Sequence, residues 1–314
     1  MSEVRVAIIG AGPMALAHAL AFRHAGAAIS GVTSRTRHKA DELSQILGGV
    51  SVYDGVQDLI DHERPDLIVI SVSVLSIPAV TLECLGSGAT LLIEKPAGLN
   101  LAEAQALAKK VDESGDKAFL ALNRRCYASV RWVLDQVPEG LRYVRVQDQQ
   151  SLTRAREFGH PEDVLAGWHF ANSIHLVDLL RVFCRGAATA VDVLNPLADG
   201  SGVLLAKVKF DSGDIGVYEA VWEGPGPWAA SIHANGLRFH LQPLESATMQ
   251  KLGVREALVM PVCNEDVDFK AGLVQQARET IEACQGRTSG LQSLKQGLAT
   301  MELVHQIYAK NSAL

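Results

Sequence analysis

The sequence is poor in cysteine, in metal-binding patterns and in aromatic residues. Its 314 residues include five scattered cysteines, with no C-x-x-C spacing: Cys84, Cys126, Cys184, Cys263 and Cys284. This odd number and spacing suit neither a disulfide framework nor a zinc site, so we expect reduced thiols in a cytoplasmic protein. We expect no bound metal, because the sequence also lacks an HExxH motif and a carboxylate cluster.

Charge and hydropathy exclude two further classes of protein. The chain carries 29 Lys and Arg against 35 Asp and Glu, a formal charge of −6, and it has no basic stripe for binding nucleic acid. The most apolar stretch, residues 67–82, is interrupted by serines and Pro78, and it is shorter than the roughly 20 residues of a membrane-spanning helix. Arg5 interrupts the apolar N-terminal run, so we expect no signal peptide. The sequence predicts neither a nucleic-acid nor a membrane partner.

The first part of the chain alternates short β-rich runs with Ala-rich helical patterns. Strands are expected over 4–9, 28–33, 67–72, 90–93 and 119–122, and helices over 14–25, 38–47, 58–62, 78–86 and 101–114. Strands that are apolar at nearly every residue are buried on both faces, as in a parallel sheet flanked by helices. The pattern predicts an α/β, doubly wound Rossmann domain over residues 1–122 that binds NAD(P).

The second part of the chain has a different rhythm, with strand-like runs that follow one another. Strands are expected over 141–148, 190–194, 203–210, 215–222, 229–234 and 237–241, and helices over 173–183, 268–283 and 291–309. Asn235-Gly236 is a typical hairpin turn. We therefore expect an α+β domain over residues 123–314, built on a largely antiparallel open sheet. Its roles would be substrate binding and oligomerisation, since an uncovered sheet face favours a homodimer or homotetramer.

A glycine-rich turn follows the first predicted strand. Gly10-Ala11-Gly12-Pro13-Met14-Ala15 fits the G-x-G-x-x-G/A pattern and opens the first helix. The glycines allow a tight turn and a close approach of backbone to a pyrophosphate, which then lies at the helix N-terminus. We expect Gly10, Gly12, Pro13 and Met14 to bind a dinucleotide. The alternative is a purely structural glycine turn.

The end of the second strand distinguishes between the two nicotinamide cofactors. NAD sites usually place Asp or Glu there, on the ribose 2′-hydroxyl. This chain has Ser34, followed by Arg35 and Arg37, so a hydroxyl and cations stand where a carboxylate would repel a 2′-phosphate. The pattern favours NADP over NAD. The alternative is a solvated, basic start to the next helix.

Glu94-Lys95-Pro96 follows the buried strand 90–93. Together with the glycine fingerprint and the α+β second half, it resembles the glucose–fructose oxidoreductase/inositol dehydrogenase (Gfo/Idh/MocA) family over essentially the whole chain. The resemblance implies that Lys95 contacts the substrate hydroxyl and the nicotinamide ribose. Lys95 also lies at the carboxyl end of a parallel strand, where open α/β sheets bind ligands. The same edge adds Ser71, Val72 and Glu94 as cofactor-binding candidates, and a surface lysine is the alternative for Lys95.

A second family-like segment covers residues 167–178. Many members have D-x-x-x-H-x-x-D here; this chain keeps His175 and Asp178 but has Ala171 in place of the first Asp. The resemblance implies that His175 is catalytic and binds substrate. On a helix, Asp178 would share a face with His175 and could orient its imidazole. A satisfied core histidine is the alternative.

The expected substrate side contains several further polar residues. Trp168, His169 and Asn172 are candidate substrate contacts, as is Arg125, because Asn123-Arg124-Arg125-Cys126-Tyr127 resembles the family's N-x-R-aromatic segment. The stretch with Arg154, Arg156 and His160 is rich in cations.

The sequence therefore predicts an NADP(H)-dependent oxidoreductase that transfers a hydride at a carbinol or carbonyl carbon of a sugar. Because of the cationic stretch, we expect a nucleotide-activated or otherwise anionic sugar. One alternative is an inositol, free-sugar or diol dehydrogenase. Another is a non-catalytic NADP-sensing regulator on the same scaffold, and a third is a reductase of an aromatic or tetrapyrrole substrate.

Overall fold

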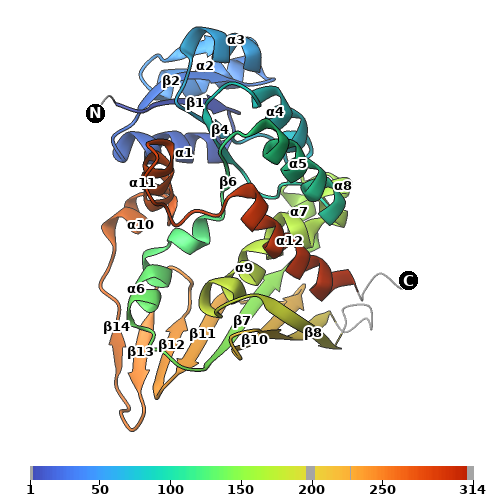
Figure 1. The fold of residues 1–314 in the computed structure, drawn as a ribbon, viewed down its shortest axis with the longest axis vertical. Helices are drawn as coiled ribbons and strands as arrows, with labels where there is room; N and C mark the ends of the chain where they lie inside the picture. Colours follow the sequence, from blue (N-terminus) through green and yellow to red (C-terminus); the bar gives the residue numbers. More distant parts are fainter. Residues whose placement is uncertain (1–2, 196–201, 227, 310–314) are drawn as a thin grey trace. The chain divides into compact units, whose positions relative to one another are not determined.

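The computed structural model describes residues 3–195, 202–226 and 228–309 (Figure 1). Contacts divide the chain into two compact units. The first unit extends to Asn123 and also contains Glu265–Leu298, whereas the second contains Arg124–Asn264 and continues from Ala299. Each unit is described by itself below.

The first unit is built on a six-stranded parallel sheet with the order β3-β2-β1-β4-β5-β6. Its strands are β1 (Arg5–Ile9), β2 (Ala28–Thr33), β3 (Ser51–Tyr53), β4 (Leu67–Ile70), β5 (Thr90–Ile93) and β6 (Ala118–Leu120). Its main helices are α1 (Pro13–His24), α2 (Arg37–Ile46), α3 (Val56–Glu63), α4 (Ile77–Cys84), α5 (Leu101–Ser114) and α11 (Leu273–Cys284). The predicted doubly wound Rossmann fold is confirmed.

Helix α11 belongs to the first unit although it lies far along the chain. It packs against α1, and its Leu273, Val274 and Ala277 join the core that β1 and α1 form. The sequence predicted one helix over 268–283, whereas the structure has α10 (Asn264–Asp268) and then α11. Gly272 separates them with a φ of +76°, a left-handed conformation that suits glycine. By contacts, then, the first unit is not a single continuous segment of the chain.

The second unit is built on an eight-stranded sheet with the order β14-β13-β12-β11-β7-β10-β9-β8. Its strands are β7 (Arg142–Gln150), β8 (Ala188–Asn195), β9 (Val203–Phe210), β10 (Ile215–Trp222), β11 (Ala229–Ala234), β12 (Leu237–Leu241), β13 (Thr248–Lys251) and β14 (Ala257–Val259). Neighbouring strands are antiparallel except for β7 and β10, which are parallel. The predicted, largely antiparallel sheet is confirmed.

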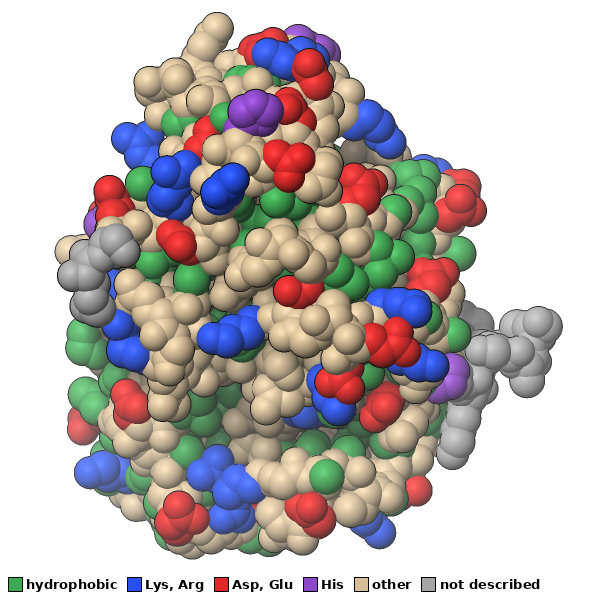
Figure 2. Space-filling view, turned by 45° about the horizontal axis from the view of Figure 1, so that its top comes forward, with side chains coloured by type: hydrophobic (Ala, Val, Ile, Leu, Met, Phe, Trp, Pro, Cys, Tyr) green, Lys and Arg blue, Asp and Glu red, His purple; other side chains and the backbone are tan. Residues whose placement is uncertain are grey.

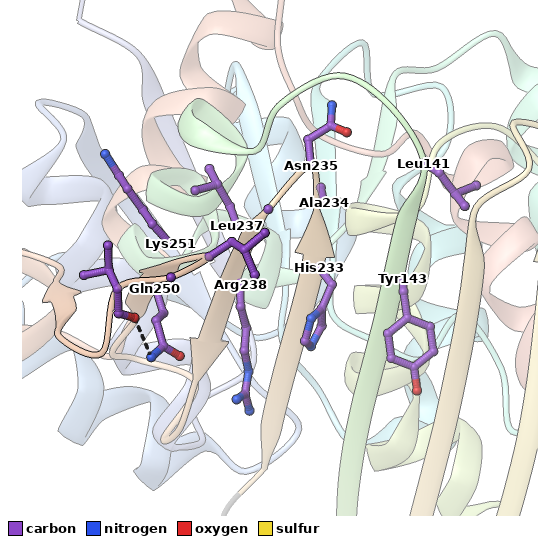
Figure 3. A pocket seen from close by; sticks show the side chains of 13 residues that line it. Leu141, Tyr143, His233, Ala234, Asn235, Leu237, Arg238, Gln250 and Lys251 are labelled. Atoms are coloured by element: carbon purple, nitrogen blue, oxygen red, sulfur yellow. Dashed lines mark hydrogen bonds between the residues drawn. The ribbon is translucent and has the colours of Figure 1, made fainter.

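Helix α9 (Ile174–Phe183) covers one face of this sheet. The other helices of this part of the chain are α6 (Ala128–Gln136), α7 (Leu152–Glu157), α8 (Glu162–Ala166) and α12 (Leu294–Ala309), whose first residues belong to the first unit, with a π-helical turn over His169–Ser173. The buried helix α9 packs on β7 and β10. Side chains of the opposite face are half-buried or exposed, and Tyr143, His233 and Arg238 line a shallow hollow near one end of it (Figure 3).

The surface carries charges of both signs. Figure 2 shows Lys and Arg interspersed with Asp and Glu over the face in view, without an extended field of either sign. Within the described residues, no helix has both the length and the apolar character that crossing a membrane requires.

Asp214 fastens the turn between β9 and β10 to the rest of the second unit. Its side chain is fully buried and accepts hydrogen bonds from the backbone nitrogens of Arg142 and Arg185, each at 2.9 Å. The Arg185 guanidinium adds two more, at 2.8 and 3.0 Å. Burial alone would raise the pKa of Asp214, but these donors outweigh burial and lower it from 3.8 to about 2.

Because Asp214 has a lower pKa in the folded protein than in the unfolded chain, it stabilises the fold fully above about pH 4. This contribution is lost as the pH falls toward 2. We expect Asp214→Asn to lower the free energy of unfolding by about 2 kcal/mol at pH 7, and the deficit to shrink between about pH 4 and pH 2. Urea unfolding followed by tryptophan fluorescence measures it, because all four tryptophans lie in the second unit.

The matched control is Asp192→Asn, which removes an exposed carboxylate on the edge strand β8. It should change the unfolding free energy by less than about 0.5 kcal/mol. An equal loss in both variants, or a deficit for Asp214→Asn that does not depend on pH, would contradict the assignment.

Candidate functional site

A cavity of about 690 Å³ follows the carboxyl ends of the strands in the first unit. This edge is where open α/β sheets bind ligands, and the volume lies within the usual range for small-molecule and cofactor sites. The lining residues are 9–14 at the end of β1 and beyond it, 33–36 and Lys39 at the end of β2 and beyond it, 54–56 after β3, 71–74 and Ser76 after β4, Val80 and Glu83 of α4, and Glu94 and Lys95 after β5.

The glycine fingerprint forms the part of the cavity next to α1. Gly10 has a φ of +116°, and a Cβ at this position would lie 2.0 Å from the carbonyl oxygen of Ser71. Gly12 has no atom within 4 Å of the place where its Cβ would be, so its missing side chain leaves open space. Pro13 begins α1 without an N–H to satisfy. The turn thus offers a cradle at a helix N-terminus, and its shape fits a pyrophosphate.

The end of β2 carries the residues predicted to select the cofactor. Ser34, Arg35 and Lys39 all line the cavity, and the side chains of Arg35 and Lys39 are exposed. In the described part of the chain, neither Arg35 nor Lys39 forms a side-chain hydrogen bond or an ion pair with another residue. Both cations are therefore available to an anionic group. Lys39 was not among the predicted site residues, although it lies in the same cationic run of the sequence.

Arg37 was predicted to bind the cofactor, but it does not line the cavity. Its guanidinium binds Asp41, one turn along α2 and 3.0 Å away, and also Asp54 after β3. The hydrogen bonds to Asp41 and then to Asp54 raise the pKa of Arg37. Two carboxylates thus neutralise this cation, which leaves Arg35 and Lys39 as the basic residues of this end.

Glu94 and Lys95 form the opposite end of the cavity, after β5. One carboxylate oxygen of Glu94 lies 2.7 Å from Nε2 of His18 on α1, and the other accepts the backbone N–H of Lys95 at 3.1 Å. His18 is 1% exposed and Glu94 is 9% exposed. Burial raises the pKa of Glu94, but the hydrogen bond and charge of His18, together with Lys95, hold it below the usual value. The peptide bond between Lys95 and Pro96 is cis.

The second unit holds His175 near the start of α9, where it is 1% exposed. Its Nε2 lies 2.9 Å from a guanidinium nitrogen of Arg124. A guanidinium has no acceptor, so His175 must accept in this contact through an unprotonated Nε2. The same guanidinium lies over the Trp228 ring, 5.3 Å from its centroid. In the sequence, Arg124 was only part of the segment that resembles the family's N-x-R-aromatic motif, and no role was predicted for it.

Asp178 is bound to Arg125. The guanidinium of Arg125 donates to both carboxylate oxygens, each at 2.7 Å, and Thr300 donates to one of them at 2.7 Å. Asp178 is 1% exposed, so this bidentate pair is an internal one. The role of Asp178 in orienting His175 and the role of Arg125 in binding substrate stay predictions.

Gln150, at the end of β7, organises the predicted substrate contacts Trp168 and Asn172. Its amide nitrogen donates to the buried Asp148 at 2.6 Å. Its amide oxygen must then face the other way, where it accepts from Trp168 at 2.7 Å and from Asn172 at 2.9 Å. Asn172 uses its own amide nitrogen in this bond, which leaves its Oδ1 oriented as an acceptor. No motif in the sequence indicated Gln150.

The remaining predicted residues of this region have varied surroundings. His169 stacks on Tyr308 with ring centroids 4.8 Å apart, and burial, with a smaller contribution from His305, lowers its pKa to about 4. Arg156 forms two hydrogen bonds with Glu162, at 2.7 and 3.0 Å, so its charge is neutralised locally.

Across residues 3–195, 202–226 and 228–309, no three His, Cys, Asp or Glu side chains gather as they would to hold a metal ion.

Comparisons with known proteins agree with this geometry. Residues 4–122 match the model of an oxidoreductase family with an NAD-binding Rossmann fold, GFO_IDH_MocA. No curated protein matches the sequence.

Solved structures match nearly the full chain at low sequence identity, which shows the fold. A dehydrogenase from Chromobacterium violaceum has a TM-score of 0.82 and 17% identity, over 98% of this chain and 94% of that one. A UDP-N-acetylglucosamine 3-dehydrogenase from Acidithiobacillus ferrooxidans has a TM-score of 0.78 and 18% identity, over 98% of each chain. A levoglucosan dehydrogenase in complex with NADH and levoglucosan has a TM-score of 0.80 and 14% identity, over 99% and 98%. The resemblance seen in the sequence is confirmed for the first part of the chain: residues 4–122 match the Gfo/Idh/MocA oxidoreductase family with its NAD-binding Rossmann fold.

Proposed function

We propose that this protein is an NADP(H)-dependent oxidoreductase that moves a hydride between nicotinamide and a carbinol or carbonyl carbon of a sugar. The observation that carries the proposal is the single cavity that joins the glycine fingerprint, the cations after β2 and Lys95 after β5. A dinucleotide cofactor and a proton-exchanging lysine are the minimum that such a reaction needs.

In this proposal each group has a stated task. Bound nicotinamide supplies the hydride chemistry. The backbone at Gly10 and Gly12 holds the pyrophosphate, and Lys95 exchanges a proton with the reacting hydroxyl. His175, in the second unit, is the second catalytic residue of the proposal. Asn172 presents its amide oxygen to another hydroxyl, since its nitrogen is held by Gln150.

The preference for NADP over NAD rests on the charges after β2. Arg35 and Lys39 line the cavity without a carboxylate partner among the described residues, and Ser34 stands where NAD sites have an acid. A guanidinium matches the oxygens of a phosphate in a bidentate pair, so a 2′-phosphate is the ligand that this end favours.

For the substrate, the ion pairs of the arginines in the second unit favour an uncharged molecule over an anion. The sequence favoured an anionic sugar because of Arg125, Arg154 and Arg156, but Arg125 is held by Asp178 and Arg156 by Glu162. We therefore propose an uncharged sugar or polyol first and a nucleotide-activated sugar second. Among the structural relatives, one is named for a nucleotide sugar and another holds levoglucosan.

We also propose that the protein is a homo-oligomer that uses the open face of its second sheet. Helix α9 packs on the other face, while the open face exposes 42% of Tyr143 and 61% of Leu141. Exposed apolar groups on a wide sheet are typical of a surface that associates. Light scattering during gel filtration measures the oligomeric state directly.

The first prediction of this proposal concerns the cofactor. Arg35→Ala should weaken NADPH binding by about 1.5–3 kcal/mol, the range for hydrogen bonds to charged groups, and leave NADH binding nearly unchanged. Arg37→Ala is the matched control, because Arg37 is neutralised by Asp41 and Asp54. Fluorescence titrations with NADPH and NADH measure both variants. Equal affinity of the wild type for the two cofactors would remove the basis for the preference.

The second prediction concerns catalysis. Lys95→Met and His175→Gln should each slow hydride transfer by about 10²–10⁴-fold, the usual effect of removing a general acid or base. The glutamine keeps an acceptor for Arg124, so the loss reports proton transfer. His160→Gln removes an exposed histidine and should be neutral. Stopped-flow absorbance of NADPH gives the rate with the best sugar in a panel of nucleotide sugars, free sugars and inositols. Tight NADPH binding with no turnover on the whole panel would favour the NADP-sensing regulator.

The third prediction distinguishes the two substrate classes. With an uncharged sugar, kcat/KM should vary by less than about twofold between about 50 and 500 mM salt, since no charge steers the encounter. Arg154→Ala should then have no effect. A steep fall of kcat/KM with salt, together with a raised KM for Arg154→Ala, would instead identify an anionic sugar.

A further inference from the structure

The two ends of the cofactor cavity differ in charge. The strand order places β2 and β5 on opposite sides of β1 and β4, so Arg35 and Glu94 lie at opposite ends of the cavity. In this fold the adenosine ribose lies at the end of β2 and the pyrophosphate lies at α1. An extended dinucleotide bound in this way has its nicotinamide toward Glu94.

Both oxygens of the Glu94 carboxyl group have a hydrogen-bond partner. One lies 2.7 Å from Nε2 of His18, and the other accepts the backbone N–H of Lys95. These contacts outweigh burial and hold the pKa of Glu94 below its usual value, so the group is ionised near neutral pH. Because its side chain is only 11% exposed, water screens its charge weakly.

Oxidised and reduced nicotinamide differ in charge at this end. The oxidised ring carries a positive charge, whereas the reduced ring is neutral. A fixed negative charge nearby attracts the first and has little effect on the second. Binding energy that differs between two forms of a ligand shifts the equilibrium between them.

We propose that the His18–Glu94 pair sets the redox preference of the bound cofactor, by fixing a buried negative charge that favours the oxidised form. The inference rests on the proposed function in one respect, namely that a nicotinamide dinucleotide binds in this cavity. Glu94 contributes the charge. His18 is a positioning residue that acts through Glu94.

His18 is suited to that task by its place on α1. It follows the glycine fingerprint by less than two helical turns and is buried, so the pair links the helix that carries the pyrophosphate cradle to the turn that carries Lys95. Without His18, one oxygen of Glu94 would lose its donor in a buried place, and the carboxylate would be poorly stabilised. The ammonium of Lys95 is present in the wild type and in every variant below, so its effect cancels in the comparison.

The test compares the dissociation constants of NADP⁺ and NADPH for the purified full-length protein. Glu94→Gln keeps the size of the side chain and removes its charge. We expect the ratio of the NADP⁺ constant to the NADPH constant to rise about tenfold, mainly through weaker NADP⁺ binding. Such a change corresponds to a shift of about 30 mV to more positive potential for a bound two-electron couple. NADPH fluorescence titration, with NADP⁺ as competitor, gives both constants without any turnover.

Two further variants test the role of His18 while leaving residue 94 unchanged. His18→Gln keeps an N–H donor close to the position of Nε2 and should preserve the wild-type ratio within about threefold. His18→Leu removes the donor and should move the ratio toward that of Glu94→Gln. The matched control is Glu83→Gln, which removes an exposed carboxylate from the lining of the same cavity. It should leave the ratio unchanged.

The outcomes separate this inference from the proposed function. A ratio for Glu94→Gln within about twofold of wild type overturns the inference, and so does an equal shift in Glu83→Gln. In both cases the wild type still binds its cofactor, and the proposed function stands. A wild type that binds neither NADP(H) nor NAD(H) overturns the proposed function itself. If NAD(H) binds more tightly, the same ratio is measured with NAD⁺ and NADH.

Discussion

The close approach of the chain at Gly10 to the end of β4 is the constraint on which the nucleotide site depends. A Cβ on Gly10 would lie 2.0 Å from the carbonyl oxygen of Ser71, well inside the contact distance of any two atoms. Only glycine allows this approach, and the positive φ of Gly10 demands glycine independently. The contact brings the turn after β1 and the loop after β4 together, and the cavity continues from them to Lys95. The fingerprint is therefore a packing requirement as well as a cradle for phosphate.

A second theme is that buried carboxylates have dedicated donors. Asp178 is held by Arg125 and Asp214 by Arg185, while Glu94 is held by His18. Asp148 accepts from Gln150 and from the hydroxyl of Tyr218. A buried charge without partners would cost several kcal/mol, so each acid fixes the orientation of the groups around it. This ordering extends outward, because Asp148 sets the direction of the Gln150 amide, and that amide sets the direction of Asn172.

The sequence predicted the fold well because its signals there are local. Continuous apolar runs identified β4 and β5, and successive strand-like runs identified β9, β10, β11 and β12 with the bounds that the structure has. The choice among neighbouring cations was not predicted, because it depends on the fold: Arg35 lines the cavity, whereas Arg37 binds Asp41 and also Asp54, which follows another strand. The same holds for Gln150 and for the docking of α11 on α1, which depend on partners distant in sequence. Composition identified the cationic stretch around Arg156, but not that Glu162 would neutralise it.

The replacement of the family's aspartate by Ala171 has a physical consequence at His175. Asp178, three residues further along α9, is bound to Arg125, and Asp148 of β7 is bound to Gln150 and Tyr218. The contact on Nε2 of His175 is instead a cation, Arg124, whose guanidinium is also stacked on Trp228. Since Nε2 accepts from Arg124, the proton of the neutral ring is on Nδ1, and His175 is placed to donate a hydrogen bond from that nitrogen.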